Sequence, residues 1–219
     1  SSSLSLHGKE LEVLPPEIGQ LTSLTELDLG LNELAELPPE IGNLTNLTNL
    51  KADRNRLKTL PPEIGNLRNL TQLNVGANDL TELPPEIGNL TNLTNLQLGH
   101  SRMSHRHNQL TRLPPEIGNM ASLTWLNLYR NYLNELPVEI GNLTNLKFLN
   151  LDGNRLTELP PTIGKLGNLN ILDLTNNELT ELPPEIGNLT GLKELLLGGN
   201  RLTWLPSELG NLNDLTELF

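Results

Sequence analysis

Three of the four histidines in this 219-residue chain lie within one eight-residue stretch, where they are candidates for holding a metal ion: His100, His105 and His107. Imidazole nitrogens are common zinc ligands, and a third ligand would complete a catalytic type of site. The stretch has neither the His-Glu-x-x-His spacing of zinc hydrolases nor a fixed carboxylate beside it, and the chain contains no cysteine. We therefore treat the three histidines as weak metal candidates and expect no cofactor.

The same stretch is basic within an acidic protein. Arg102 and Arg106 alternate with the histidines, whereas the whole chain carries 26 acidic and 15 basic side chains and a net charge of −11. Such a loop suits contact with a partner, and histidines with an ordinary pKa near 6.5 would make that contact sensitive to pH. A tolerated insertion without a function is the alternative.

Signals of catalysis are weak elsewhere in the sequence. Asp28, Lys51, Asp53 and Arg54 bring carboxylates and bases together, as acid–base chemistry requires, but a solvated charge cluster has the same composition. The sequence contains no nucleophile elbow and no glycine-rich phosphate loop. We therefore expect a protein that is not an enzyme.

Charge and hydropathy narrow the class of partner. A net charge of −11 disfavours binding to nucleic acid and to anionic lipid, because both are polyanions. No apolar run approaches the 18 residues of a membrane span. We therefore expect a protein or peptide partner, no nucleic acid and no membrane.

An internal repeat must position these residues. Asparagine recurs every 23 residues, with a single step of 30, at Asn32, Asn55, Asn78, Asn108, Asn131, Asn154, Asn177 and Asn200. We predict one domain over residues 1–219, with a half repeat at 1–13, a partial repeat at 205–219 and a seven-residue insertion at about 101–107. Eight full repeats begin at Leu14, Leu37, Leu60, Leu83, Leu113, Leu136, Leu159 and Leu182.

Each repeat predicts a short strand followed by a tight return. Alternating leucines such as Leu27 and Leu29 indicate a strand, and stacked repeats would form a parallel sheet. The amide of the recurring asparagine can donate to and accept from backbone groups of the adjacent coil. Pro-Pro excludes a long helix and favours an extended or 3₁₀ return. The fold class is therefore α/β: a right-handed, curved solenoid with a concave parallel β-sheet and mainly 3₁₀ or extended convex returns.

The repeated sequence pattern L-x-x-L-x-L-x-x-N-x-L-x-x-L-P-x-x-I resembles the leucine-rich repeat in its 23-residue intracellular form. The Leu-Pro-Pro-Glu-Ile-Gly-Asn-Leu block at residues 37–44 is similar to the arrays of Ras-pathway scaffolds, plant intracellular Ras-group proteins and Roco GTPases. This resemblance implies a horseshoe-shaped interaction module. It leaves the partner open.

The 30-residue repeat can be aligned in two ways. Either residues 101–107 are inserted before Asn108, or Ser101 replaces the recurring asparagine and residues 104–110 are extra. We favour the first alignment, because the regular repeat sequence resumes at Asn108.

The predicted sheet surface becomes apolar at one place. The first outward position of successive strands reads Ser3, Glu26, Asn49, Gln72, Asn95, Trp125, Phe148, Ile171, Glu194 and Glu217. Four of the six aromatic residues belong to two adjacent repeats: Trp125, Tyr129, Tyr132 and Phe148. Trp and Tyr are frequent binding hot spots. The predicted partner-binding residues are therefore Trp125, Tyr129, Phe148, Ile171, Arg130, Asn127, Asn150, His100, Arg102, His105, Arg106 and His107. Mutual packing of the aromatic rings is the alternative.

These patterns favour a non-catalytic scaffold that binds a protein or peptide. A structural or consensus-type array without an evolved ligand, and a sensor arm of a larger signalling protein such as a Roco GTPase, are the alternatives. Neither end carries a polar capping unit, which suggests truncation or ends covered by another subunit, so we expect a monomer or weak self-association. Without cysteine or a signal-like stretch, we expect a cytoplasmic protein.

Overall fold

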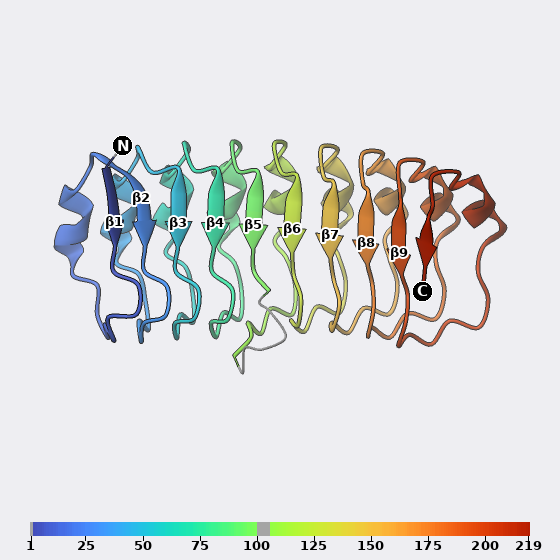
Figure 1. The fold of residues 1–219 in the computed structure, drawn as a ribbon, viewed down its shortest axis with the longest axis horizontal. Coiled ribbons are helices and arrows are strands. Elements are labelled where there is room, and N and C mark those ends of the chain that lie inside the picture. The colour runs from blue at the N-terminus through green and yellow to red at the C-terminus, as the bar shows by residue number, and fades with distance from the viewer. Residues whose placement is uncertain (1, 100–105) are drawn as a thin grey trace.

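The computed structural model describes residues 2–99 and 106–219, which form a single sheet of ten parallel strands in chain order (Figure 1). All the strands are short, between two and five residues. Their bounds are β1 Ser2–Ser5, β2 Leu24–Asp28, β3 Asn49–Lys51, β4 Gln72–Asn74, β5 Asn95–Gln97, β6 Trp125–Asn127, β7 Phe148–Asn150, β8 Ile171–Asp173, β9 Glu194–Leu196 and β10 Glu217–Leu218.

Strand pairing follows the repeat. Leu27 lies opposite Leu50, and Leu50 lies opposite Leu73, so equivalent positions of neighbouring repeats face each other. The same one-to-one register runs through every later pair, and a shift occurs between Ser2 and Ser3 of the first pair. Because side chains alternate across a strand, this register places every central leucine on the inner side and its two neighbours on the outer face of the sheet.

A 3₁₀ segment lies behind the sheet in each repeat (Figure 1). Each begins after a proline in extended conformation, and Pro-Pro occupies the start in all but two of the described segments. Their bounds are η1 Pro16–Gln20, η2 Pro39–Asn43, η3 Pro62–Asn66, η4 Pro85–Asn89, η5 Pro115–Asn119, η6 Val138–Asn142, η7 Pro161–Lys165, η8 Pro184–Asn188 and η9 Ser207–Asn211. In the part of the chain that the structure describes, none of the helices has the length and apolar character needed to cross a bilayer.

Glycine in the 3₁₀ segment allows adjacent repeats to approach closely. A Cβ atom on Gly42 would lie 2.6 Å from the carbonyl oxygen of Glu63 and 2.7 Å from its Cβ. The same approach recurs at Gly65 against Glu86. The recurring glycine is therefore a packing requirement between repeats.

One continuous core of leucine and isoleucine fills the space between the sheet and the 3₁₀ segments. The recurring asparagines lie beside it and connect the turns, and all of them except Asn200 are buried. Asn78, which is fully buried, accepts a bond from the Leu57 amide at 3.0 Å and donates to the carbonyls of Ala52 at 2.9 Å and Val75 at 3.0 Å. The predicted role of these amides is confirmed, as is the predicted solenoid with a parallel sheet and 3₁₀ returns.

Asn108 occupies the same place after the long repeat. Its side chain accepts from the Leu80 amide at 3.1 Å and donates to Val75 and Leu98 at 3.0 and 2.8 Å. These are the bonds that Asn78 makes one repeat earlier. The extra residues of this repeat therefore precede the asparagine that closes the turn, and the exact repeat boundaries stay a prediction.

Candidate binding surface on the sheet

Two aromatic rings stack on the outer face of the sheet. Trp125 begins β6 and lies opposite Phe148, which begins β7, and Phe148 lies opposite Ile171 of β8. The rings of Trp125 and Phe148 are nearly parallel, at 11°, with 3.6 Å between their centroids. Trp125 still exposes 39% of its surface, whereas Phe148 and Ile171 are half-buried. We call these three residues the aromatic row.

Amide side chains adjoin the aromatic row and also support the strand ends. Oδ1 of Asn127 accepts the backbone N–H of Tyr129 at 3.0 Å, and Oδ1 of Asn150 accepts that of Asp152 at 2.9 Å. The other end of Asn127 donates to Oε1 of Gln97 at 3.0 Å. Because these oxygens are already engaged, Asn127 and Asn150 hold the chain in its turn.

Tyr129 differs from its neighbours. The sequence predicted an outward anchor, but the residue is only 7% exposed. The guanidinium of Arg130 lies over its ring, 5.3 Å from the centroid, and Gly99 of the preceding repeat packs directly against its backbone. Tyr129 is therefore a support beneath exposed Arg130, and the prediction that it is an exposed contact is wrong.

The end of the inserted stretch is fixed to both neighbouring repeats. Arg106 forms an ion pair with Asp79 at 2.9 Å, on the preceding side. Nε2 of His107 lies 3.1 Å from the hydroxyl of Tyr132, on the following side, with the two rings edge to face at 5.7 Å. The predicted contacts His100, Arg102 and His105 lie outside the described residues. Among the residues that are described, no group of three histidine or acidic side chains is placed to hold a metal ion.

Tyr132 and Arg155 join this contact, although the sequence did not single them out as site residues. The Arg155 guanidinium lies 4.4 Å from the centre of the Tyr132 ring, on which His107 also packs. Tyr132 and Arg155 each follow a recurring asparagine by one residue, so they are neighbours one repeat apart. Their equivalent positions in adjacent repeats are the sequence signal that could have predicted this contact.

The charged cluster near the N-terminus has a local structural role. Oδ1 of Asp28 accepts the Gly30 amide at 2.9 Å and lies 3.3 Å from Nδ1 of His7. Asp28 thus closes its own turn in the way that Asn127 and Asn150 do. Lys51 is exposed on the next strand. This geometry agrees with a solvated cluster.

Family models match most of the chain. A leucine-rich repeat region is matched over residues 3–103 and 138–219, and a leucine rich repeat over residues 106–156. Among curated proteins none matches significantly.

Solved structures share both fold and sequence. A leucine-rich-repeat protein of Leptospira interrogans is 43% identical with a TM-score of 0.90, over 98% of this chain and 53% of that one. The ectodomain of the Arabidopsis thaliana receptor kinase GASSHO1/SCHENGEN3, solved in complex with CASPARIAN STRIP INTEGRITY FACTOR 2, is 36% identical with a TM-score of 0.82, over 98% and 26%. The leucine-rich repeat domain of the type III effector XopL is 29% identical with a TM-score of 0.86, over 99% and 75%. The chain thus spans about half of the Leptospira protein and a quarter of the plant ectodomain.

Proposed function

The chain belongs to the leucine-rich-repeat family, and from that premise we propose that it is a non-catalytic scaffold that binds a protein or peptide segment on the outer face of its sheet. Leucine-rich repeats commonly serve as protein-binding scaffolds, and the plant ectodomain was solved in complex with CASPARIAN STRIP INTEGRITY FACTOR 2. Fold alone does not place a binding site, so the proposal rests on the side chains of this chain.

The single observation that carries the proposal is the exposure of Trp125 on the aromatic row. Stacking covers one side of its indole, yet 39% of the residue remains accessible on a sheet face whose other first positions are mainly polar. A large exposed ring held rigid by a neighbour loses little entropy when a partner covers it. Trp125, Phe148 and Ile171 therefore form the proposed centre of the contact.

Polar residues around the row would form its rim. The Asn127 and Asn150 amides lie on the same strands as Trp125 and Phe148, and Arg130 follows β6 with its charge exposed above Tyr129. Arg106 and His107 would flank the contact from the end of the inserted stretch. Rim charges of this kind mainly set association rate and specificity.

A selection from a phage-displayed library of random dodecapeptides tests the proposal. The bait is the 219-residue chain, compared with Trp125→Ser/Phe148→Ser, and both are checked for equal folding by circular dichroism. Wild type should enrich a sequence family, and the double variant should bind the selected peptides at least tenfold more weakly, because hot-spot aromatics contribute about 2 kcal/mol or more.

Trp204→Ser is the matched control, because Trp204 is also exposed, at 52%, but does not belong to the aromatic row. It should retain the selected peptides. Equal binding by wild type and the double variant would exclude the row as the site. Failure of wild type to enrich any sequence would favour the alternative of a structural array without an evolved ligand.

A further inference from the structure

An open groove of about 560 Å³ crosses the starts of the 3₁₀ segments η6, η7 and η8. These segments lie behind the sheet, so the groove lies away from the aromatic row (Figure 1). Most of its lining is apolar and comes from Val138 and from the leucines and prolines of three successive Leu-Pro motifs. Each of the charged residues that line it is a glutamate: Glu135, Glu158, Glu181 and Glu185.

Val138 makes the wall of this groove unlike the start of the other segments. It stands where proline begins most of the 3₁₀ segments, and it is 57% exposed. The hydroxyl of Thr162 in the next segment donates to the Val138 carbonyl at 2.6 Å. Thr162 in turn stands where each of the other described segments has a glutamate. These two departures from the repeat together hold an exposed aliphatic side chain in the groove.

Three successive repeats each bring a glutamate to the groove. Glu135, Glu158 and Glu181 directly precede the Leu-Pro of their repeats, and all three are exposed. In the other repeats the residue at this position is mixed: Val13, Glu36, Thr59, Glu82, Arg112 and Trp204. Like charges one repeat apart repel each other, so this run of glutamates does not stabilise the fold.

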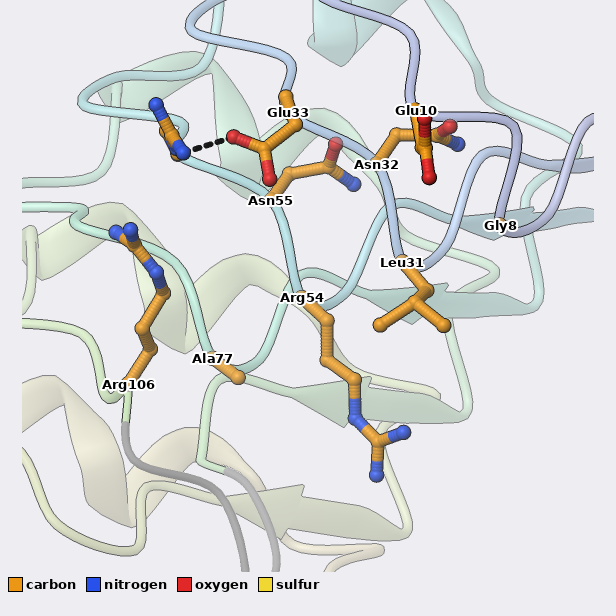
Figure 2. A pocket seen from close by; sticks show the side chains of 10 residues that line it. Gly8, Glu10, Leu31, Asn32, Glu33, Arg54, Asn55, Ala77 and Arg106 are labelled. Carbon is orange, nitrogen blue, oxygen red and sulfur yellow. Dashed lines mark ion pairs between the residues drawn. The ribbon is translucent and has the colours of Figure 1, made fainter.

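Elsewhere the array neutralises carboxylates with arginines of the adjacent repeat. Arg56 pairs with Glu33 in a second groove, near the N-terminus (Figure 2), and Arg201 pairs with Glu178 at 2.9 Å. In the part of the chain that the structure describes, none of the four groove glutamates forms an ion pair or a side-chain hydrogen bond. Their negative charge is therefore available to a partner.

We propose that this groove binds a basic peptide segment, with lysine or arginine side chains on the glutamates and an aliphatic side chain against Val138. Charge complementarity selects this occupant, because the charged lining residues are all acidic and would repel an acidic segment or a phosphodiester chain. Glu135 and Glu181 are two repeats apart, about 10 Å at the strand spacing, which about three extended residues span. This site goes beyond the proposed function and uses none of the aromatic row.

Fluorescence polarisation with labelled synthetic heptapeptides tests the proposal at low ionic strength. The probes are Ala-Lys-Leu-Lys-Leu-Lys-Ala, its neutral counterpart Ala-Gln-Leu-Gln-Leu-Gln-Ala, and Ala-Lys-Ser-Lys-Ser-Lys-Ala, which keeps the charge without the aliphatic side chains. Wild type should bind the first peptide about tenfold tighter than the neutral one and about threefold tighter than the serine one. Glu158→Gln/Glu181→Gln should bind it about tenfold more weakly, because each substitution removes an exposed ion pair that contributes about threefold.

Two further variants separate the groove from general electrostatics and test its apolar wall. Glu36→Gln/Glu82→Gln removes the same charge at the same repeat position, also exposed but outside the groove, and should stay within twofold of wild type. Val138→Ser introduces the residue that Ser207 supplies at the start of η9. It should weaken binding of the leucine peptide about threefold and leave the serine peptide unchanged. Circular dichroism should show all variants folded.

The proposal is overturned if the two glutamate variants lose affinity equally, which would show general attraction to an acidic protein, or if the neutral peptide binds as tightly as the basic one. Equal affinity for the leucine and serine peptides would overturn the aliphatic contact, and absence of binding by all three peptides would overturn the site. Because Trp125→Ser/Phe148→Ser leaves the groove intact, that variant should bind the basic peptide normally even if the aromatic row proves to have no ligand.

Discussion

The indole of Trp125 lies 3.6 Å from the phenyl ring of Phe148, centroid to centroid, across two neighbouring parallel strands. Direct opposition of equivalent positions brings the rings together, since both stand at the first outward place of their strands. The contact lies outside the leucine core. It therefore stabilises a surface that the rest of the array does not need for folding.

Breaking this stack should lower the free energy of unfolding by a modest but measurable amount. We expect Trp125→Ala and Phe148→Ala each to lower the free energy of unfolding by about 1–2 kcal/mol, with a coupling of about 1 kcal/mol between them, because stacked aromatic pairs contribute about 0.5–1.5 kcal/mol beyond burial. A double-mutant cycle in urea measures the coupling. A coupling indistinguishable from zero would show that the rings contribute independently.

Loss of a buried asparagine should also be costly. Asn78→Ala removes the partner of the Leu57 amide and one of the two asparagine donors to each of the Ala52 and Val75 carbonyls, which Asn55 and Asn108 still bond. A buried amide left unpaired costs about 1–3 kcal/mol, so we expect a loss of about 2 kcal/mol or more. Chemical denaturation measures it. Asn200→Ala, at a partly exposed position with the same bonds, should cost clearly less. Equal losses would contradict the argument from burial.

Two glycines, Gly42 within η2 and Gly167 just after η7, permit a direct comparison of close and open positions. Gly42→Ala would place Cβ 2.6 Å from the Glu63 carbonyl, whereas Cβ on Gly167 would meet no atom within 4 Å. We expect Gly42→Ala to lower the free energy of unfolding by about 2 kcal/mol through overpacking and Gly167→Ala to change it by less than about 1 kcal/mol. Thermal unfolding followed by circular dichroism measures both. A neutral Gly42→Ala would refute the packing role.

The contact between His107 and Tyr132 should protect the start of the repeat that follows the insertion. Tyr132→Phe removes the hydroxyl that lies 3.1 Å from Nε2 of His107 but keeps the ring against Arg155. We expect hydrogen exchange at the Gln109 amide to accelerate by about fivefold, equivalent to about 1 kcal/mol. The Leu57 amide, two repeats earlier in the chain, is the internal reference and should not change. Unaltered exchange at Gln109 would show that the hydroxyl does not hold this segment.

The repeat made the fold predictable because each element depends on residues close in sequence. Alternation at Leu27 and Leu29 predicts a strand, Pro-Pro followed by Ile-Gly predicts a 3₁₀ return, and the 23-residue period stacks them in register. The hydrogen bonds of the recurring asparagines could be predicted from the same 23-residue period. Little tertiary information was needed, since every repeat packs on a copy of itself.

The candidate surface was harder to predict, because it depends on what neighbouring repeats do to particular side chains. Alternation places Tyr129 outward, yet Arg130 covers its ring and makes it a support. Alternation equally leaves Asn127 free, but its oxygen caps the following turn. The sequence predicted that Trp125 and Phe148 lie in one row. Their parallel stacking depends on the register of β6 and β7, which the structure shows.

The one-to-one register has a consequence for how such a chain can change length. Because Leu27 meets Leu50 and Leu50 meets Leu73, shifting the chain by one whole repeat returns every contact to an equivalent contact. Duplication or deletion of 23 residues therefore preserves the core, whereas loss of a single residue within a strand would put the leucines of that repeat out of phase with those of its neighbours. Whole repeats can therefore be added or removed on either side of the aromatic row without redesigning the row itself.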